Sequence, residues 1–469
     1  MDIPIEGGPR METAKKTDNS ICDAFAEFSV QTRYEKIPSE VIHQAKRCIL
    51  DLFGVALAGS GVGIAPCLSA LFRDMGGTPE ATFFGERGKF PALNVALVNA
   101  AKGHTLDMDD GHRYANAHPG VPLIPAAVAL AERDDRSGKQ LIEAVVVGYE
   151  AFIRVARAIN PKHLERGFHT TGTVGSLGAA AACAKILQLG QKETADAISI
   201  AGLQSAGLLE VLKTGQIMKP LHPAKASHAG LLSALLAGMG NQGPDPMFEG
   251  NNGFLKAYAG VSASPEITAD LGKQFEIINV YFKLHAACRH VHPALDAVGI
   301  IMGKHKVPIE KITSIKVYTY SIANKLTGQI RKVENELEAK FSLPISIGLM
   351  LRYGTAGVDQ YDMTFIKDKM VQNMADKVEI IVEPERDAIY PKQRGARICI
   401  ETPDRIFSED VPVPKGDPEN PFSDGELREK FLSNAKKTMS EKSALELSVK
   451  IFDMEKYSVR ELISCMSGS

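Results

Sequence analysis

The chain has 469 residues, which suits one large domain with a smaller one, or two to three ordinary domains. Its 54 basic and 56 acidic residues nearly balance, and no block of five or more like charges occurs, so we expect neither nucleic acid nor a membrane as a partner. The first residues lack the pattern of a signal peptide, and the uncharged stretches are shorter than the roughly 18 apolar residues of a membrane span. We therefore expect a cytoplasmic protein.

The cysteine pattern argues against a disulfide framework and against a cysteine-ligated metal. The seven cysteines are scattered, odd in number and never spaced as CxxC. They fit a reducing compartment, and they are Cys22, Cys48, Cys67, Cys183, Cys288, Cys399 and Cys465.

Helical patterns dominate the first part of the chain. Residues 1–19 predict a flexible tail, and residues 20–265 predict a large helical domain. Pro38 and Ser39 mark one helix start, and apolar residues follow at spacings of three and four. Many later segments are rich in Ala and Gly, so we expect helices that pack closely.

The pattern changes near residue 265. Two helices and three β-branched strands are predicted, at 293–305 and 341–354 for the helices and at 313–321, 377–385 and 396–404 for the strands. We expect an α+β lid domain over residues 266–405, inserted into the helical domain. Helices within residues 406–469 would complete that helical domain, so the predicted fold class is mostly α with a smaller inserted α+β lid.

Four polar islands interrupt the apolar helices, at residues 104–120, 167–175, 217–230 and 283–297. Each island combines His or Lys with Gly, Pro or other small residues at an expected helix end. A large helical fold can present side chains to a cavity at such positions, so we look for function in these islands.

The first island, HTLDMDDGHRYANAHPG, allows three interpretations. His104 and Asp107 are three residues apart, so both can face one side of a helix end, where Asp107 would orient a histidine or a substrate hydroxyl. The aspartates can instead cap and solvate a loop, which we favour for Asp109 and Asp110. Metal binding would need convergent ligands such as Asp107, Asp110, His104 and His118, but HExxH and cysteine partners are absent, and we expect no metal.

The other islands carry further candidates. GFHTTGTVGSLG matches no phosphate loop, so its glycines favour close helix packing, while His169 precedes a helix start that suits an anion. Lys219 lies between apolar residues and is either a snorkelling side chain or a charge in a pocket. In the last island, sequence spacing does not choose among His285, His290 and His292.

Taken together, LDMDDGHRYANAHPG, GFHTTGTVGSLGAAAA, KPLHPAKASHAG and KLHAACRHVHPALDA resemble, in this order, the MmgE/PrpD family. That family includes 2-methylcitrate dehydratase, cis-aconitate decarboxylase and iminodisuccinate epimerase. The resemblance runs from about residue 20 to 460. It implies a helical domain with an α+β lid, a homodimer, an active site between the domains, and no metal or organic cofactor.

The resemblance also implies site residues. The catalytic set it implies is Asp107, His118, His169, Lys219 and His292, and the substrate-binding set is His104, His222, Tyr318 and Tyr320, of which one tyrosine would be the lid tyrosine. The chain departs from the family pattern where a hydroxyl contact and a glycine–arginine pair are expected, namely at Gly111, His112, Ala224, Lys225, Ser227 and His228. We expect these departures to fall on positions that grip the substrate, so they leave the identity of the substrate open.

The expected function is that of a cofactor-independent lyase, a dehydratase or decarboxylase that moves a proton next to a carboxylate of a small di- or tricarboxylic acid. A lysine and a helix N-terminus would stabilise the developing charge, and His118 or His292 would act as base. The alternatives are a dicarboxylate epimerase using the same residues, a metal-dependent hydrolase, and a non-catalytic helical binding protein.

Overall fold

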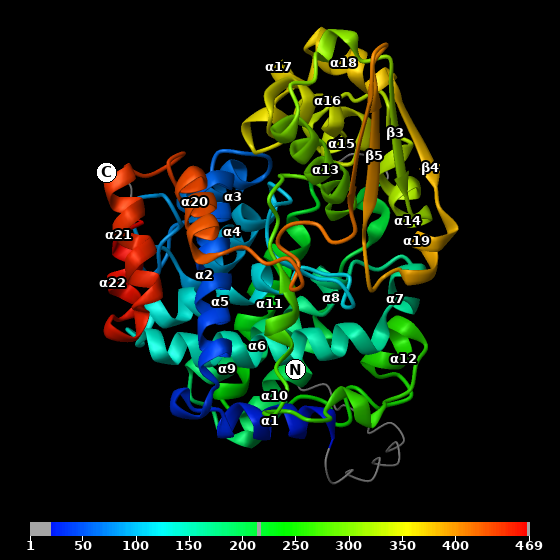
Figure 1. Cartoon of the computed structure of the whole chain (residues 1–469). Coiled ribbons are helices and arrows are strands. Elements are labelled where there is room, and N and C mark those ends of the chain that lie inside the picture. The colour runs from blue at the N-terminus through cyan, green and yellow to red at the C-terminus, as the bar shows by residue number, and fades with distance from the viewer. Residues whose placement is uncertain (1–19, 213–216, 467–469) are drawn as a thin grey trace, which may run out of the picture.

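The computed structural model describes residues 20–212 and 217–466, and the predicted tail at residues 1–19 lies outside these ranges. The described chain forms a large helical part and a smaller part that contains a sheet (Figure 1). This arrangement confirms the predicted fold class of a mostly α protein with a smaller α+β unit.

The helical part contains the helices of the first half of the chain. They are α1 (Ile21–Gln31), α2 (Ser39–Gly59), α3 (Ala65–Met75), α4 (Ala92–His104), α5 (Gly120–Arg133), α6 (Gly138–Ile159), α7 (Lys162–Glu165), α8 (Thr170–Thr173), α9 (Gly175–Ile186), α10 (Gln191–Leu203), α11 (Leu221–Gly238) and α12 (Phe254–Ala259). The fully buried α9 packs against α5, α6, α10 and α11.

Glycines allow these helices to approach closely, as the sequence predicts. A Cβ added at Gly230 of α11 would lie 2.4 Å from the Cβ of Ala179 on α9. A Cβ added at Gly178 would lie 2.9 Å from the Cβ of Phe152 on α6. Both distances are too short for carbon atoms, so larger residues would force the helices apart.

The smaller part is built on a four-stranded sheet in the order β4-β3-β5-β6. The strands are β3 (Ser314–Thr319), β4 (Val378–Val382), β5 (Ala396–Glu401) and β6 (Ile406–Val411), and β3 is parallel to β4 but antiparallel to β5. The sheet therefore extends past residue 405, where we placed the end of the lid. Its helices are α13 (His292–Lys304), α14 (Ser321–Ala323), α15 (Glu336–Lys340), α16 (Leu343–Tyr353), α17 (Met363–Ile366), α18 (Lys369–Asp376) and α19 (Pro384–Ile389).

The two parts meet at the chain between α4 and α5. Leu106 and Met108 from this segment belong to the apolar core of the smaller part, together with Val55 and Ala58 of α2. A second contact is the short ladder of β1 (Gly111–His112) with β2 (Val280–Tyr281). The first polar island is thus held between the two cores.

The chain returns to the helical part at its C-terminal end. Helices α20 (Asp424–Ala435), α21 (Glu441–Phe452) and α22 (Val459–Ser464), red in Figure 1, lie beside α2 and α5 of the N-terminal half. In residues 20–212 and 217–466, we find no helix with the length and apolar character needed to cross a bilayer.

Candidate active site

The segment between α4 and α5 forms the floor of the candidate site. Helix α4 ends at His104, and Asp107 adopts a left-handed backbone conformation with φ 52°. We predicted that His104 and Asp107 face the same side of a helix end. The helix does not bring them together, because Asp107 lies in the turn that follows it. A turn at this point is tolerable for Asp, since its short polar side chain lowers the cost of a positive φ.

Asp107 lies between two buried lysines. Lys219 Nζ donates to Asp107 Oδ1 at 2.6 Å, and Lys283 Nζ lies 3.3 Å from Oδ2 while donating to the Asp107 carbonyl at 2.7 Å. Burial alone would raise the pKa of the Asp107 carboxyl, but the two ammonium groups hold this pKa well below its usual range. Lys219 is 5% exposed, so it is a charge in a pocket and does not snorkel to the surface.

A cavity of about 300 Å³ opens beside this ion cluster. It is bounded by His104, Asp107 and Lys219 from the helical part and by residues 334–337 and Lys340 from the smaller part. Lys340 is buried, and its Nζ has a long contact of 3.5 Å to the Thr105 carbonyl. Burial lowers the pKa of Lys340 to about 8, although Asp107 acts in the opposite direction.

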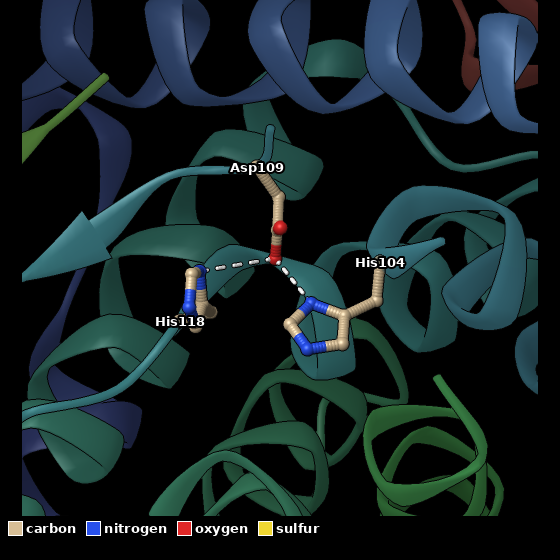
Figure 2. A group of neighbouring side chains, drawn as sticks. All are labelled: His104, Asp109 and His118. Carbon is tan, nitrogen blue, oxygen red and sulfur yellow. Dashed lines mark hydrogen bonds and ion pairs between the residues drawn. The ribbon is translucent and has the colours of Figure 1, made fainter. Parts of the chain in front are cut away.

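Two residues after Asp107, the carboxylate of Asp109 contacts the imidazoles of His104 and His118 (Figure 2). His104 Nδ1 donates to Asp109 Oδ2 at 2.9 Å, and His118 Nδ1 lies 3.4 Å from the same oxygen. Burial lowers the pKa of both imidazoles, that of His118 to about 3, so both rings are neutral at neutral pH. Burial works against ionisation of Asp109, but the two histidines keep its pKa below the usual range.

The same geometry brings together a set of possible metal ligands that differs from the set considered from the sequence. Within the described residues, ligand atoms come within 4.8 Å of one another in the set His104, Asp109 and His118, which is not the predicted set. His118 Nδ1 donates to the Asp110 carbonyl at 2.7 Å, so this nitrogen carries a hydrogen and has no free lone pair. His104 Nδ1 also carries a hydrogen, because it donates to Asp109.

Asp110 takes the structural role that we favoured for it, and Asp109 does not. Asp110 accepts from the backbone N–H of Gly120 at the start of α5 and from the Tyr149 hydroxyl at 2.5 Å. Burial raises the pKa of Asp110 to about 8. Asp109 makes no such cap and instead faces His104, so the capping interpretation of Asp109 is wrong.

His169 and His222 form a pair next to the cluster. Their Nδ1 atoms lie 3.0 Å apart, and the ring of His169 lies 6.1 Å from that of His104. Burial lowers the pKa of His169 well below its usual range and that of His222 to about 4. The helix after His169, α8, has four residues, so its N-terminus offers little of the dipole that we expected to favour an anion.

The histidines of the last island lie elsewhere. Arg289 donates to His292 Nδ1 at 3.1 Å, and His292 Nε2 donates to the Ala287 carbonyl at 3.2 Å, so both ring nitrogens have partners. His285 pairs with Asp296 at 2.9 Å. The residues that border the cavity include none of the three histidines of this island.

The two tyrosines predicted for the lid do not border this cavity either. Tyr320 is fully buried, and its hydroxyl is hydrogen-bonded to His290 Nδ1 at 2.6 Å. Tyr318 lies on the face of β3 opposite the buried Ile315 and Val317, and its ring stacks under the Arg397 guanidinium at 4.0 Å.

Comparison with known families agrees with the division of the chain into two parts. The model of the MmgE/PrpD N-terminal domain matches residues 23–266, and that of the MmgE/PrpD C-terminal domain matches residues 285–453. The chain belongs to the MmgE/PrpD family.

Several relatives of this MmgE/PrpD chain carry an activity in their names. It is 27% identical over 487 residues to cis-aconitate decarboxylase-like protein oryM of Aspergillus oryzae, covering 97% of this chain and 99% of that protein. It is 26% identical to the cis-aconitate decarboxylase of Mus musculus and 27% identical to that of Homo sapiens, covering 94% and 90% of this chain and 92% and 89% of those proteins. These names place a lyase activity among the relatives.

The structure shows the surroundings of three departures from the MmgE/PrpD pattern, namely Gly111, Ala224 and Lys225. A Cβ on Gly111 would lie 2.3 Å from the Tyr281 hydroxyl, so the tyrosine occupies the space in which a side chain of residue 111 would lie. Ala224 packs against Ala100 and Ala101, and Lys225 donates to the Gln204 carbonyl away from the cavity. The prediction that the residue 224–228 changes fall in the substrate grip is not supported by this geometry.

Sequence reasoning missed three charged residues of the site. Lys283 is the first residue of the fourth island and lies two residues before His285, but only the histidines of that island were considered as candidates. Asp109 belongs to the first island but looked like a cap. Lys340 stands in an ordinary helical segment, and no local sequence signal distinguishes it from a surface lysine.

Proposed function

We propose that the chain is a lyase that acts on a small di- or tricarboxylate by moving a proton at a carbon next to a carboxylate. The observation that carries the proposal is the convergence of Lys219, Lys283 and Lys340 on Asp107. Lys219 and Lys340 border the cavity itself, together with Glu334 and Glu336, so carboxylates of a substrate can bind these ammonium groups directly.

The size of the cavity agrees with a small substrate. A volume of about 300 Å³ is at the lower end of the range for ligand pockets. The relatives from Mus musculus and Homo sapiens act, by their names, on cis-aconitate, so this tricarboxylate is the first substrate that we propose. Substrate carboxylates would bind the ammonium groups of Lys219 and Lys340, one from each part of the molecule.

The chemistry follows from charge. A carbon next to a carboxylate is a weak acid, so removal of its proton requires stabilisation of negative charge on the carboxylate oxygens. In decarboxylation, the carbon–carbon bond breaks, carbon dioxide leaves, and the electron pair ends on a carbon that takes up a proton. Buried ammonium groups stabilise this negative charge more strongly than water does, and the imidazole of His104 borders the cavity, where it can handle the proton.

The experiment follows proton NMR spectra of the purified chain with cis-aconitate, 2-methylcitrate and iminodisuccinate in D₂O, with and without chelator. Lys219→Met removes one ammonium group, and Lys225→Met is the matched control, because Lys225 lies six residues further along the chain, in α11, and donates to the Gln204 carbonyl. We expect a decarboxylated product that contains deuterium, unchanged by chelator. We expect Lys219→Met to lower kcat/KM roughly 100-fold or more and Lys225→Met to leave it unchanged.

The other outcomes identify the alternatives. Deuterium exchange without loss of carbon dioxide or water would show an epimerase and overturn the lyase proposal. Loss of activity in chelator would show a metal-dependent enzyme. Binding of the acids without any change in their spectra would show a binding protein.

A further inference from the structure

His104 combines two features that suit a proton-transfer group. Its Nδ1 donates to Asp109, and its Nε2 is buried and has no hydrogen-bond partner among the described residues. The residue is also part of the wall of the cavity beside Asp107 and Lys219. A buried nitrogen without a hydrogen-bond partner costs free energy, so a ligand that hydrogen-bonds to this nitrogen would recover that cost on binding.

The neighbouring histidines do not share both features. His118 donates from Nδ1 to the Asp110 carbonyl, and His169 and His222 hydrogen-bond to each other. None of these three borders the cavity. Among the histidines of residues 20–212 and 217–466, His104 is the one that both borders this cavity and keeps an unpartnered nitrogen.

We propose, on the basis of the proposed function, that Nε2 of His104 exchanges the proton with the substrate carbon and that Asp109 positions the imidazole for this step. In deprotonation, the carbon–hydrogen bond breaks, Nε2 takes the proton, and the electron pair passes into the adjacent carboxylate. In decarboxylation, the protonated Nε2 gives its proton to the carbon that keeps the electron pair after carbon dioxide has left, and solvent returns the proton to Nε2.

The contact with Asp109 fixes the tautomer that this step requires. A carboxylate that accepts from Nδ1–H leaves the lone pair on Nε2 and stabilises the imidazolium that forms after proton uptake. Figure 2 shows Asp109 between the two imidazoles, on the side of the His104 ring that carries Nδ1. Asp109 does not border the cavity, so it acts through His104.

Electrostatics supports a change of protonation when substrate binds. Burial lowers the pKa of His104, and Lys219 lowers it further, against the effect of Asp109. A bound polycarboxylate adds negative charge next to the ring and raises this pKa toward neutrality. The charged and titratable groups around His104 are Asp107, Asp109, His118, His169, Lys219 and His222.

The chain supplies a matched control for this His–Asp pair. His43 Nε2 and Asp424 Oδ1 lie 3.0 Å apart, nearly the same separation as in the His104–Asp109 pair, but both side chains are almost half exposed at the surface. The experiment compares His104→Gln and Asp109→Asn with His43→Gln and Asp424→Asn. It measures kcat, KM and the pH profile on the substrate that the wild-type chain turns over, and deuterium incorporation from D₂O.

We expect His104→Gln to lower kcat at least 100-fold with KM changed only a few-fold, and deuterium incorporation to fall in parallel. Asp109→Asn should lower kcat 10-fold to 100-fold and move the limb of the pH profile that reports His104 to lower pH, because removal of the carboxylate lowers the pKa of His104. This is the basic limb for decarboxylation, where His104 acts as an acid, and the acidic limb for deprotonation, where it acts as a base. The two surface variants should match the wild type. Circular dichroism verifies that each variant is folded.

If the wild-type chain is active and the kcat of His104→Gln lies within a few-fold of the wild-type kcat, this inference is overturned and the proposed function stands. A wild-type chain that converts no acid would overturn both. A measurement without turnover tests the positioning separately, since nitrogen NMR of the wild-type chain labelled at histidine should show His104 with its hydrogen on Nδ1. A hydrogen on Nε2 would contradict the assigned geometry.

Discussion

Two histidine-rich regions of the molecule look alike in sequence, but among the described residues a histidine with an unpartnered buried nitrogen borders the cavity in the first region and not in the second. In the first region, His104 keeps an unpartnered nitrogen beside a cavity lined with lysines. In the second region, His285 is paired with Asp296, His290 with Tyr320, and His292 with Arg289 and a backbone carbonyl. The comparison teaches that unused bonding capacity next to a cavity marks a site better than the density of histidines does.

The largest effect that we expect is on the charges of the first region. Asp107→Asn removes the carboxylate between Lys219 and Lys283 and leaves two buried ammonium groups without their direct ion-pair partner, so the free energy of unfolding should fall by roughly 3–5 kcal/mol. In the second region, Asp296→Asn should lower the free energy of unfolding by roughly 1–3 kcal/mol. This loss is smaller because Asp296 makes hydrogen bonds to His285 and to the Lys415 backbone and does not neutralise two buried lysines. Denaturant unfolding of both variants checks this, and equal losses would erase the difference.

A substitution in the second region should act on stability and not on chemistry. His292→Ala leaves a cavity and removes the partners of Arg289 and of the Ala287 carbonyl, so we expect a loss of roughly 2–4 kcal/mol of unfolding free energy. The kcat of the folded fraction should stay within a few-fold of the wild type. A 100-fold fall in kcat with unchanged stability would move His292 into the catalytic machinery.

Lys340 should contribute to substrate binding in a manner that depends on pH. Lys340→Met is expected to raise KM about 10-fold, which is the loss of one partly screened charge contact, with little change in kcat. In the wild type, the ammonium is present below its pKa of about 8 and is lost above it, so KM should rise as pH passes through 8. Steady-state kinetics from pH 7 to 9 checks this, and Lys340→Met should lack that rise.

The smallest effect is shared by the two regions. Burial lowers the pKa of His118 and of His290 to about 3, from an ordinary value of 6.5. Below pH 6.5 the unfolded chain binds a proton at each histidine while the folded chain does not, so stability falls as pH drops from 6.5 toward 3 and is unaffected above 6.5. Each group contributes about 1 kcal/mol per pH unit in this window.

Thermal melts at pH 6.5 and 5.5 test this linkage. His118→Gln and His290→Gln should each reduce the acid-induced fall in stability by a similar amount, one variant from each region. A variant that melts with the same pH dependence as the wild type would show that its histidine already takes up a proton in the folded state.

Much of the fold could be predicted because it depends on local patterns. Pro38 and Ser39 mark the start of α2, and the alternation in residues 313–321 yields β3, with Ile315 and Val317 facing inward and Tyr318 outward. The end of the sheet was harder to predict, since residues 406–411 pair with β5 but lie next to the helical C-terminal segment in sequence. Strand pairing is set by a distant partner, which a local pattern does not contain.

The sequence by itself determined the family, the two-part composition and the polar islands, because these are written in residue order and spacing. Tertiary structure alone decided which residues of those islands meet. It brings Asp107 together with Lys219 and with Lys283, which are both distant from Asp107 in sequence, and it adds Lys340 from a helix outside the islands. It also placed Asp109 within hydrogen-bonding distance of His104, and His292 within hydrogen-bonding distance of Arg289. The physical reason is that pKa, burial and free hydrogen-bonding capacity depend on neighbours in space, and neighbours in space are fixed only when the two cores pack against each other.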